Sequence, residues 1–402
     1  MRLKYRKDIS FSIAAYFLKF AGIWLAANRF EEWFRNATVV YTILSLNFSI
    51  WVQLRNLYFC WGDFTISGYI LCNSLGLFID LFKIILLVIH KKKFLNLIVY
   101  MQKNFWHFNY DDYENLIVAD AKQMCVYFVC VFSFFSQSTV FCYMTRPLIS
   151  NIGKNETERA LIFNMWLDLP LSTTPYFEIM YTIQALALYH TGVCYLCFDN
   201  IFCIMCLHVA SQFRILQYRV ANIQSAKNKT EHACSSEECY VALKHCIQQH
   251  QSLIKFCAVL EETCRMIVLA QVIVFSALIS FIGYQVILVD LSPTWRLSFI
   301  SYLMTTMCQL WMFTYSCDCV TRESANVSLA VYAGPWINLS MDKFGKMVRK
   351  DLQVVVIRSR RVCSLTAGGF FPISLETYTK IMSTAMSYFT IMKQRTVDIA
   401  DA

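Results

Sequence analysis

The side chains with the most reactive chemistry lie near the middle of this 402-residue chain. Cys194 and Cys197 have the Cys-x-x-Cys spacing of redox dithiols and of half a zinc site, and His190 and His208 flank them. A run of cysteines and histidines along one helix does not bring four ligands around one ion. The two cysteines also fall in a long apolar run, where cysteine acts as a small apolar residue. We therefore predict no metal site and no cofactor.

A second group that could do chemistry is a pair of opposite charges in an apolar run. Asp80 and Lys83 are three residues apart, so they share one face of a helix and can pair with each other. Ionisable residues inside a membrane helix are also candidates for function. Both interpretations remain open from the sequence. Asp199 and Asn200 lie nearer the predicted cytosolic end of their helix, where we expect a packing role.

Motifs of the common enzyme classes are missing from the sequence. The chain contains no His-Glu-x-x-His, no Gly-x-Ser-x-Gly and no phosphate-binding P-loop. Gly368 and Gly369 are too short a glycine run to form a phosphate loop, and they fit a flexible joint before the last span. We predict that the protein is not an enzyme.

The elements that position these residues are long apolar helices. Hydrophobic residues make up 57% of the chain and charged residues 16%, against about 25% charged in a soluble domain. A membrane helix needs roughly 20 apolar residues. Such blocks predict one all-α membrane domain over residues 1–402, with seven transmembrane helices at about 38–59, 64–89, 124–145, 176–207, 266–289, 295–317 and 370–392.

The distribution of basic residues predicts the orientation. Most of the 36 lysine and arginine residues fall in four segments, namely 1–37, 83–122, 208–256 and 318–369. Cytoplasmic loops are enriched in such residues, so we expect a cytoplasmic N-terminus and, after seven crossings, an extracellular C-terminus. Basic loops beside anionic lipid head groups also account for the net charge of +9, and no nucleic-acid partner is needed.

The last predicted span carries a stripe of polar residues. Ser383, Ser387, Thr390 and Gln394 are spaced four, three and four residues apart, which places them on one helical face. Such a stripe either joins helices or lines water. Because it ends at Lys393, Gln394 and Arg395, we favour a pore. Ile391 flanks the stripe near this mouth, where an apolar constriction can gate a channel.

The C-terminal third resembles the insect odorant-receptor family. The resemblance rests on Pro335-Trp336, a basic segment near 342–358, the arginines at 358–361, Gly-Phe-Phe-Pro-Ile-Ser-Leu at 369–375 and Ser-Tyr-Phe at 387–389. Residues 245–271 are similar to the entry of the family's fifth helix, and 169–184 to its outer loop and fourth helix. Residues 19–28, KFAGIWLAAN, resemble its N-terminal element but lack the usual following proline.

This resemblance implies a fold and a function. The family's fold has seven helices, with the last split into a cytosolic part and a pore-lining part. The resemblance also implies a tetrameric, ligand-gated, nonselective cation channel in the plasma membrane of olfactory sensory neurons. The second cytosolic loop is short, unlike that of the shared coreceptor. We therefore expect a ligand-tuning subunit that is surrounded by membrane lipid, assembles with the coreceptor and binds a small volatile organic ligand.

The resemblance also implies where the ligand binds, between the outer halves of helices two to six. The expected contacts are Ile70, Asn73 and Leu77 in the second span, Phe134, Ser138 and Phe141 in the third, Met180, Ile183 and Gln184 in the fourth, and Phe299, Tyr302 and Thr306 in the sixth. It places Ile391 at the constriction of the pore.

Three other classes of membrane protein compete with this interpretation. A gustatory-type chemoreceptor channel is the main alternative, although Phe389-Thr-Ile-Met-Lys-Gln394 departs from the gustatory pattern at the chain's end. A G-protein-coupled receptor has the opposite orientation, and the broken helices typical of transporters are missing. The acceptor Asn155-Glu-Thr lies in a predicted outer loop, so Asn155 is the expected glycosylation site.

Overall fold

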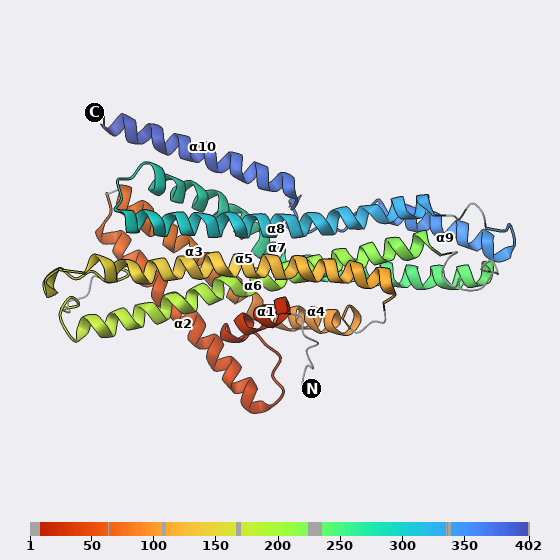
Figure 1. The fold of residues 1–402 in the computed structure, drawn as a ribbon, viewed down its shortest axis with the longest axis horizontal. Coiled ribbons are helices and arrows are strands. Elements are labelled where there is room, and N and C mark those ends of the chain that lie inside the picture. Colours follow the sequence, from red (N-terminus) through yellow and green to blue (C-terminus); the bar gives the residue numbers. More distant parts are fainter. Residues whose placement is uncertain are drawn as a thin grey trace.

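The computed structural model describes residues 9–62, 64–106, 110–165, 170–223, 235–334, 336 and 339–400. Helices dominate this part of the chain, which forms one elongated bundle (Figure 1). The elements in chain order are α1 (Ile9–Phe20), α2 (Arg29–Phe59), α3 (Phe64–Ile89), α4 (Lys91–Asn104), α5 (Asp112–Ser150), the short η1 (Glu156–Glu158), α6 (Tyr176–Ala221), α7 (Ser236–Ile287), α8 (Pro293–Ala333), α9 (Lys343–Ser359), β1 (Thr366–Ala367), β2 (Phe371–Pro372) and α10 (Leu375–Ala400).

Local sequence signals explain where several helices begin. Asp111 and Ser235 each accept a hydrogen bond from the backbone N–H three residues on, and the glutamate at that position bonds back, which forms a capping box at α5 and at α7. Asn28 caps α2 and Asp342 caps α9 through their side-chain oxygens. Pro293 occupies the first turn of α8, where its missing N–H costs nothing.

Five helices are long and apolar enough to cross a membrane among the residues described, namely α2, α3, α5, α6 and α7. The chain is therefore an all-α membrane protein. At about 1.5 Å per residue, the 46 residues of α6 extend about 69 Å, more than twice the ~30 Å hydrocarbon core. Part of the bundle must therefore extend beyond the membrane. This part contains α9 and the adjoining ends of α6 and α7 (Figure 1).

Several helices extend beyond the predicted spans. The second predicted span, 64–89, coincides with α3. The third to sixth predicted spans mark only the apolar portion of longer helices, because hydropathy falls where a helix leaves the membrane but the helix itself continues. The largest difference is in the fifth span, predicted as 266–289, for which α7 begins at Ser236.

The core is organised around α6. Every residue in the most apolar stretch of this helix is buried, and α6 contacts α1, α2, α3, α5, α7 and α8. The short α1 packs against α5 and α6, and its Phe11, Ala14, Phe17 and Leu18 side chains are buried. A central helix of this kind can connect a binding site to every neighbouring helix.

The entry to the last helix differs from the sequence expectation. The predicted span begins at residue 370, but residues 366–367 and 371–372 form an antiparallel hairpin and α10 begins at Leu375. Gly368 and Gly369 form the turn with φ of +61° and +84°, conformations that favour glycine. This hairpin, rather than a loose joint, separates α9 from α10. It is attached to α7 by a hydrogen bond from the Gly368 N–H to the Arg265 carbonyl.

Candidate ligand-binding site

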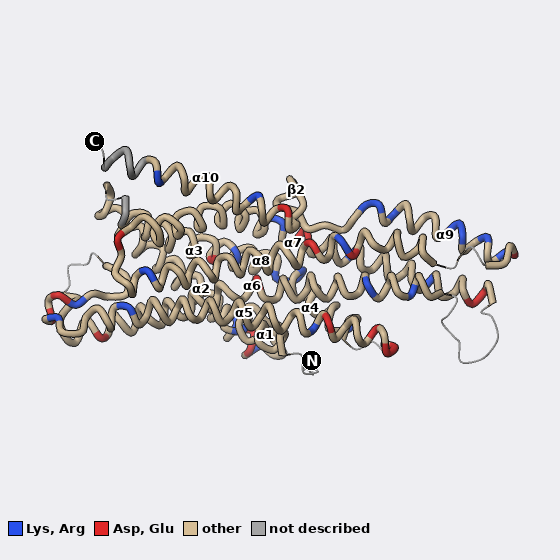
Figure 2. The backbone as a smooth tube through the Cα atoms, turned by 45° about the horizontal axis from the view of Figure 1, so that its top comes forward, with Lys and Arg blue, Asp and Glu red and all other residues tan. Residues whose placement is uncertain are grey.

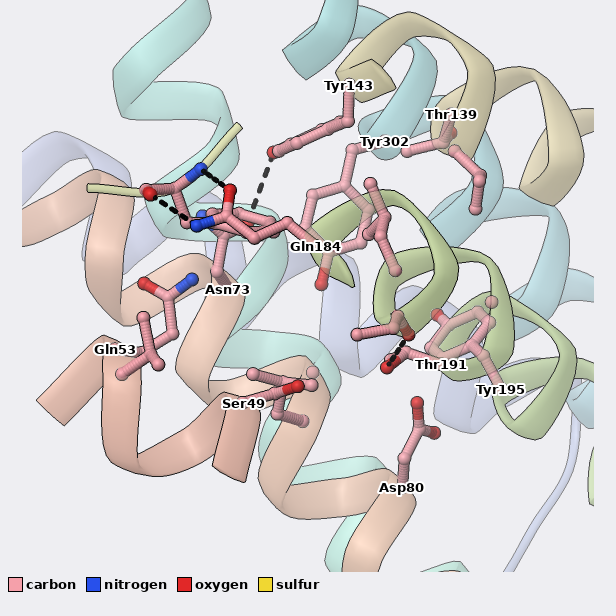
Figure 3. Close-up of a pocket in the computed structure, with 18 of the residues that line it drawn as sticks. Ser49, Gln53, Asn73, Asp80, Thr139, Tyr143, Gln184, Thr191, Tyr195 and Tyr302 are labelled. Atoms are coloured by element: carbon pink, nitrogen blue, oxygen red, sulfur yellow. Dashed lines mark hydrogen bonds between the residues drawn. The ribbon is translucent and has the colours of Figure 1, made fainter. Parts of the chain in front are cut away.

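A partly open cavity of about 130 Å³ lies among α2, α3, α5, α6 and α8. For comparison, an apolar cavity of about 150 Å³ holds a benzene molecule. Much of its wall is apolar, and most of the polar side chains around it are labelled in Figure 3. They are Ser49 and Gln53 on α2, Asn73 and Asp80 on α3, Thr139 and Tyr143 on α5, Gln184, Thr191 and Tyr195 on α6, and Tyr302 on α8.

Two glycines set how closely the cavity walls approach one another. A Cβ at Gly76 would lie 2.7 Å from the Tyr302 hydroxyl oxygen, and a Cβ at Gly192 would lie 2.6 Å from Val140 Cγ2. Both distances are too short for carbon contacts. Glycine therefore lets the Tyr302 ring reach α3 and lets α6 approach α5, which limits the cavity to the size of a small ligand.

Hydrogen bonds hold part of the segment between α5 and α6 beside the cavity. Gln184 donates from Nε2 to the Phe163 carbonyl (2.9 Å) and accepts from the Phe163 N–H at Oε1 (3.0 Å) (Figure 3). Arg146 donates to the Ile162 carbonyl at 2.8 Å and lies over the Trp295 ring at 3.7 Å. The nitrogen and the oxygen of the Gln184 amide thus both bond to this segment, and the side chain holds it beside the cavity.

Five of the twelve expected ligand contacts line this cavity: Asn73, Leu77, Ile183, Gln184 and Tyr302. The other seven do not. Ile70 and Phe299 pack into a separate apolar cluster, while Thr306 is fully buried and bonds to the Tyr302 carbonyl. Phe134, Ser138, Phe141 and Met180 lie outside the lining, and Phe134 and Phe141 are each about two-thirds exposed.

On α5, the residues that line the cavity and the residues that were expected to do so lie on different faces of the helix. The lining face carries Ser136, Thr139, Val140 and Tyr143, which repeat at intervals of three and four residues. The expected positions 134, 138 and 141 lie on neighbouring faces of the same helix. The lining residues of α2 were also not expected, because the resemblance placed the ligand between the second and sixth spans and α2 is the first.

A cluster of buried charges lies beside the cavity. Lys83 Nζ is 2.8 Å from Asp199 Oδ2 and 3.8 Å from Asp80 Oδ1, and all three side chains are 1% exposed or less. Lys83 therefore pairs most closely with a residue 116 positions away, and not with its helical neighbour. By its sequence position, Lys83 belongs to the basic segment 83–122, but its side chain is buried in this cluster.

Asp199 is the centre of this cluster, which corrects the expected packing role at a helix end. Gln271 of α7 donates to its Oδ1 at 2.6 Å, and Gln309 of α8 donates to its Oδ2 at 2.7 Å. The Tyr195 hydroxyl in turn donates to Gln309 Oε1. Because Tyr195 and Asp80 both line the cavity, the cluster connects the cavity to α7 and α8. An ionisable residue within a membrane span is the sequence signal that marks Asp199.

The polar stripe on α10 is exposed. Ser383, Ser387, Thr390 and Gln394 all lie on the uncovered side of the helix, together with Ile391. On the opposite face, Ile381 and Ala385 pack in a cluster with Phe275, Ile279 and Leu310 of α7 and α8. Figure 1 shows α10 along one side of the bundle. The hydroxyls of Ser387 and Thr390 donate to carbonyls of their own helix, so the stripe can face water or another chain.

The remaining candidate residues fall in simple environments. Cys194 and Cys197 are buried free thiols, and no group of metal-ligating side chains occurs among the residues described. Asn155 is exposed in the segment between α5 and α6, at the start of η1.

Comparisons with known proteins agree with this geometry. The model of a family described as 7tm odorant receptor matches residues 69–386. Odorant receptor 13a of Drosophila melanogaster is 23% identical, over 96% of this chain and 96% of its own length. The odorant receptor coreceptor of Aedes aegypti is 20% identical, but over only 38% of this chain and 31% of its own length.

The fold agrees with a solved structure of the same class. The insect olfactory receptor OR5 from Machilis hrabei, in complex with eugenol, superposes with a TM-score of 0.82 at 14% identity, over 96% of this chain and 97% of that one. Of the two chemoreceptor families that the sequence suggested, the matched model is that of odorant receptors. The chain belongs to the insect odorant-receptor family, whose members are multi-pass membrane chemoreceptors and not enzymes.

Proposed function

We propose that this chain is the odorant-binding subunit of a ligand-gated, nonselective cation channel that it forms with the odorant coreceptor, in the plasma membrane of olfactory sensory neurons. The observation that carries the proposal is the partly open, mainly apolar cavity within the helical bundle of the family fold. Sites for small molecules are typically concave and apolar with a few polar groups. The related receptor in complex with eugenol supports a small organic ligand here as well.

The proposed topology has seven crossings, a cytoplasmic N-terminus and an extracellular C-terminus. The crossings would be α2, α3, α5, α6, α7, α8 and α10, so that α8 and α10 join the five more apolar helices. Figure 2 supports this orientation, because lysine and arginine positions recur along the part of the bundle that contains α9. An excess of such residues favours the cytoplasmic side.

The proposed pore is lined by the exposed face of α10. Four copies of this helix, from this chain and the coreceptor, would surround a path that is polar at Ser383, Ser387, Thr390 and Gln394 and narrow at Ile391. Lys393 and Arg395 follow at the outer mouth. A full ring of these cations would repel permeant cations, which favours a heteromer over four copies of this chain.

A contiguous set of contacts leads from the cavity to α10. Tyr195 lines the cavity and donates to Gln309 on α8. The next residue, Leu310, packs in one cluster with Ala385 of α10, and Ser280 of α7 donates to the Ala385 carbonyl at 3.0 Å. A ligand that binds one arrangement of these groups more tightly than another shifts the equilibrium between them.

The experiment is to express the chain with and without a coreceptor subunit and to record whole-cell current against a panel of volatile compounds. We expect ligand-evoked cation current only when both chains are present. The panel should also be applied to the coreceptor alone, which defines the background. Equal responses with and without this chain, at verified surface levels, would contradict the proposal.

A further inference from the structure

One wall of the cavity carries a carboxylate oxygen that has no hydrogen-bond donor in the part of the chain that the structure describes. Asp80 lines the cavity with a side chain that is 1% exposed, and its Oδ1 has no hydrogen-bond partner among the residues described. The nearest cation, Lys83, is 3.8 Å from that oxygen and is engaged at 2.8 Å by Asp199. A buried carboxylate oxygen that accepts no hydrogen bond is costly, and a ligand that donates to it relieves this cost.

Asp199 needs no further donor. Its Oδ1 accepts from Gln271, and its Oδ2 accepts from Gln309 and Lys83. With all three ionisable groups charged, the two carboxylates exceed the single ammonium by one negative charge. In that state the excess negative charge would lie on Asp80, the member of the cluster that faces the cavity. An uncharged hydroxyl would satisfy one lone pair of Asp80, whereas an ammonium group would also balance the charge.

The rest of the cavity suits the organic part of such a cation. Leu77, Val140 and Leu188 provide apolar walls, and Tyr195 and Tyr302 provide aromatic ones (Figure 3). Aromatic rings attract cations through their faces. The volume of about 130 Å³ limits the ligand to a single small ring or a short branched chain.

We propose that the cavity recognises a small volatile primary amine, bound as its ammonium ion with the nitrogen at Asp80 and the hydrocarbon part against the apolar walls. A simple alkylamine has a pKa near that of lysine, about 10.4, and is therefore charged in neutral solution. This inference rests on the proposed function for its site and adds the chemical class of the ligand.

The first test measures binding without the channel. The detergent-purified chain is heated with isoamylamine, isoamyl alcohol, isovaleraldehyde or isohexane, which share one size and shape, and the midpoint of unfolding is recorded. A ligand that binds only the folded state raises this midpoint. We expect the amine to stabilise the protein at concentrations about 10- to 100-fold lower than the alcohol does, as a charged hydrogen bond implies.

Matched variants locate the effect. Asp80→Asn keeps the shape of the side chain and should remove the amine preference. Asp120→Asn is the control, because Asp120 is an exposed carboxylate paired with Arg214 at 2.6 Å, far along the chain from the cavity lining. An equal response to all four compounds in the wild type would overturn the inference even if the Asp80 variant failed to fold. Retention of the amine preference in a folded Asp80→Asn would also overturn it.

The second test separates this inference from the proposed function. The same four compounds are applied to cells that express the chain with a coreceptor. Current evoked best by the amine supports both proposals. Current evoked by other odorants, but not preferentially by the amine, supports the receptor and overturns the amine inference. A preference for the aldehyde would also overturn the amine inference, because Asp80 would then be protonated and donate to a carbonyl oxygen. Stabilisation by the amine without any current would support the site and contradict the channel.

Discussion

Replacing Lys83 with methionine tests the electrostatics of the buried cluster. Methionine keeps an unbranched side chain of similar length but removes the ammonium group. Asp80 and Asp199 would then remain buried without the cation that lies 3.8 and 2.8 Å from them. Removal of one partner from a buried ion pair is strongly destabilising, because it leaves an uncompensated charge.

The magnitude follows from these distances. At an effective dielectric constant of about 20, unit charges at 2.8 and 3.8 Å attract by about 6 and about 4 kcal/mol. Burial of the ammonium itself costs several kcal/mol, which the substitution recovers. The net loss of stability expected for Lys83→Met is therefore about 3–5 kcal/mol. Asp80→Asn should cost much less, because it leaves one cation and one anion.

The assay is thermal unfolding of the detergent-purified protein, with Lys93→Met as the matched control. Lys93 forms an ion pair with Glu262 at 2.7 Å, but both side chains are about half exposed. Such surface pairs contribute about 0–1 kcal/mol. We expect Lys83→Met to unfold at a clearly lower temperature than Lys93→Met and Asp80→Asn. The charge argument is refuted if Lys83→Met and Lys93→Met unfold together, or if Asp80→Asn is the least stable of the three.

Four further predictions address the topology, the cavity, the pore and the part outside the membrane. Asn155→Gln should remove any N-linked glycan, seen as a mobility shift equal to that caused by deglycosylation, and a glycan that survives the substitution would contradict the topology. Tyr302→Ala should change the half-maximal ligand concentration at least about tenfold and alter ligand ranking, whereas Met180→Ala, outside the cavity lining, should leave both unchanged in the same current recordings. Ile391→Ser should raise the resting current at equal surface level, because a polar side chain lowers the barrier of an apolar constriction; unchanged leak and ion selectivity would remove it from the gate. Burial lowers the pKa of His250 to about 4 from its usual 6.5, so stability present above pH 6.5 should be lost as the pH falls toward 4, and the loss should be smaller in His250→Gln when unfolding is followed against pH.

Hydropathy predicted the class of fold because lipid requires long runs of apolar residues. It recovered the bounds of α3, because the apolar run extends over the whole of this helix. It did not predict that α7 begins at Ser236, since that part of the helix is stabilised by packing outside the membrane and by its capping box. The hairpin before α10 depends on Gly368 and Gly369, whose conformation only the surrounding structure determines.

The cavity shows what one chain's sequence can and cannot indicate. The periodicity of a helix shows which residues share a face, but not which face turns toward a cavity. Asn73, Leu77 and Tyr302 were expected and do line it, whereas Thr139 and Tyr143 line it from a face of α5 that was not expected. Contacts between distant helices depend on how those helices are rotated and shifted relative to each other, and a local pattern contains neither quantity.

Asp80 and Lys83 illustrate the same limit and also suggest why the cluster exists. Their spacing predicts a local pair, yet the closest partner of Lys83 is Asp199 on α6. Buried ion pairs are often no more stabilising than apolar residues of the same volume, so stability alone does not explain three buried charges. The charges connect the cavity to particular helices. The donors to Asp199 come from α3, α7 and α8, and Asp80 faces the cavity. A ligand that alters the balance of charge at Asp80 therefore acts on the two helices against which α10 packs.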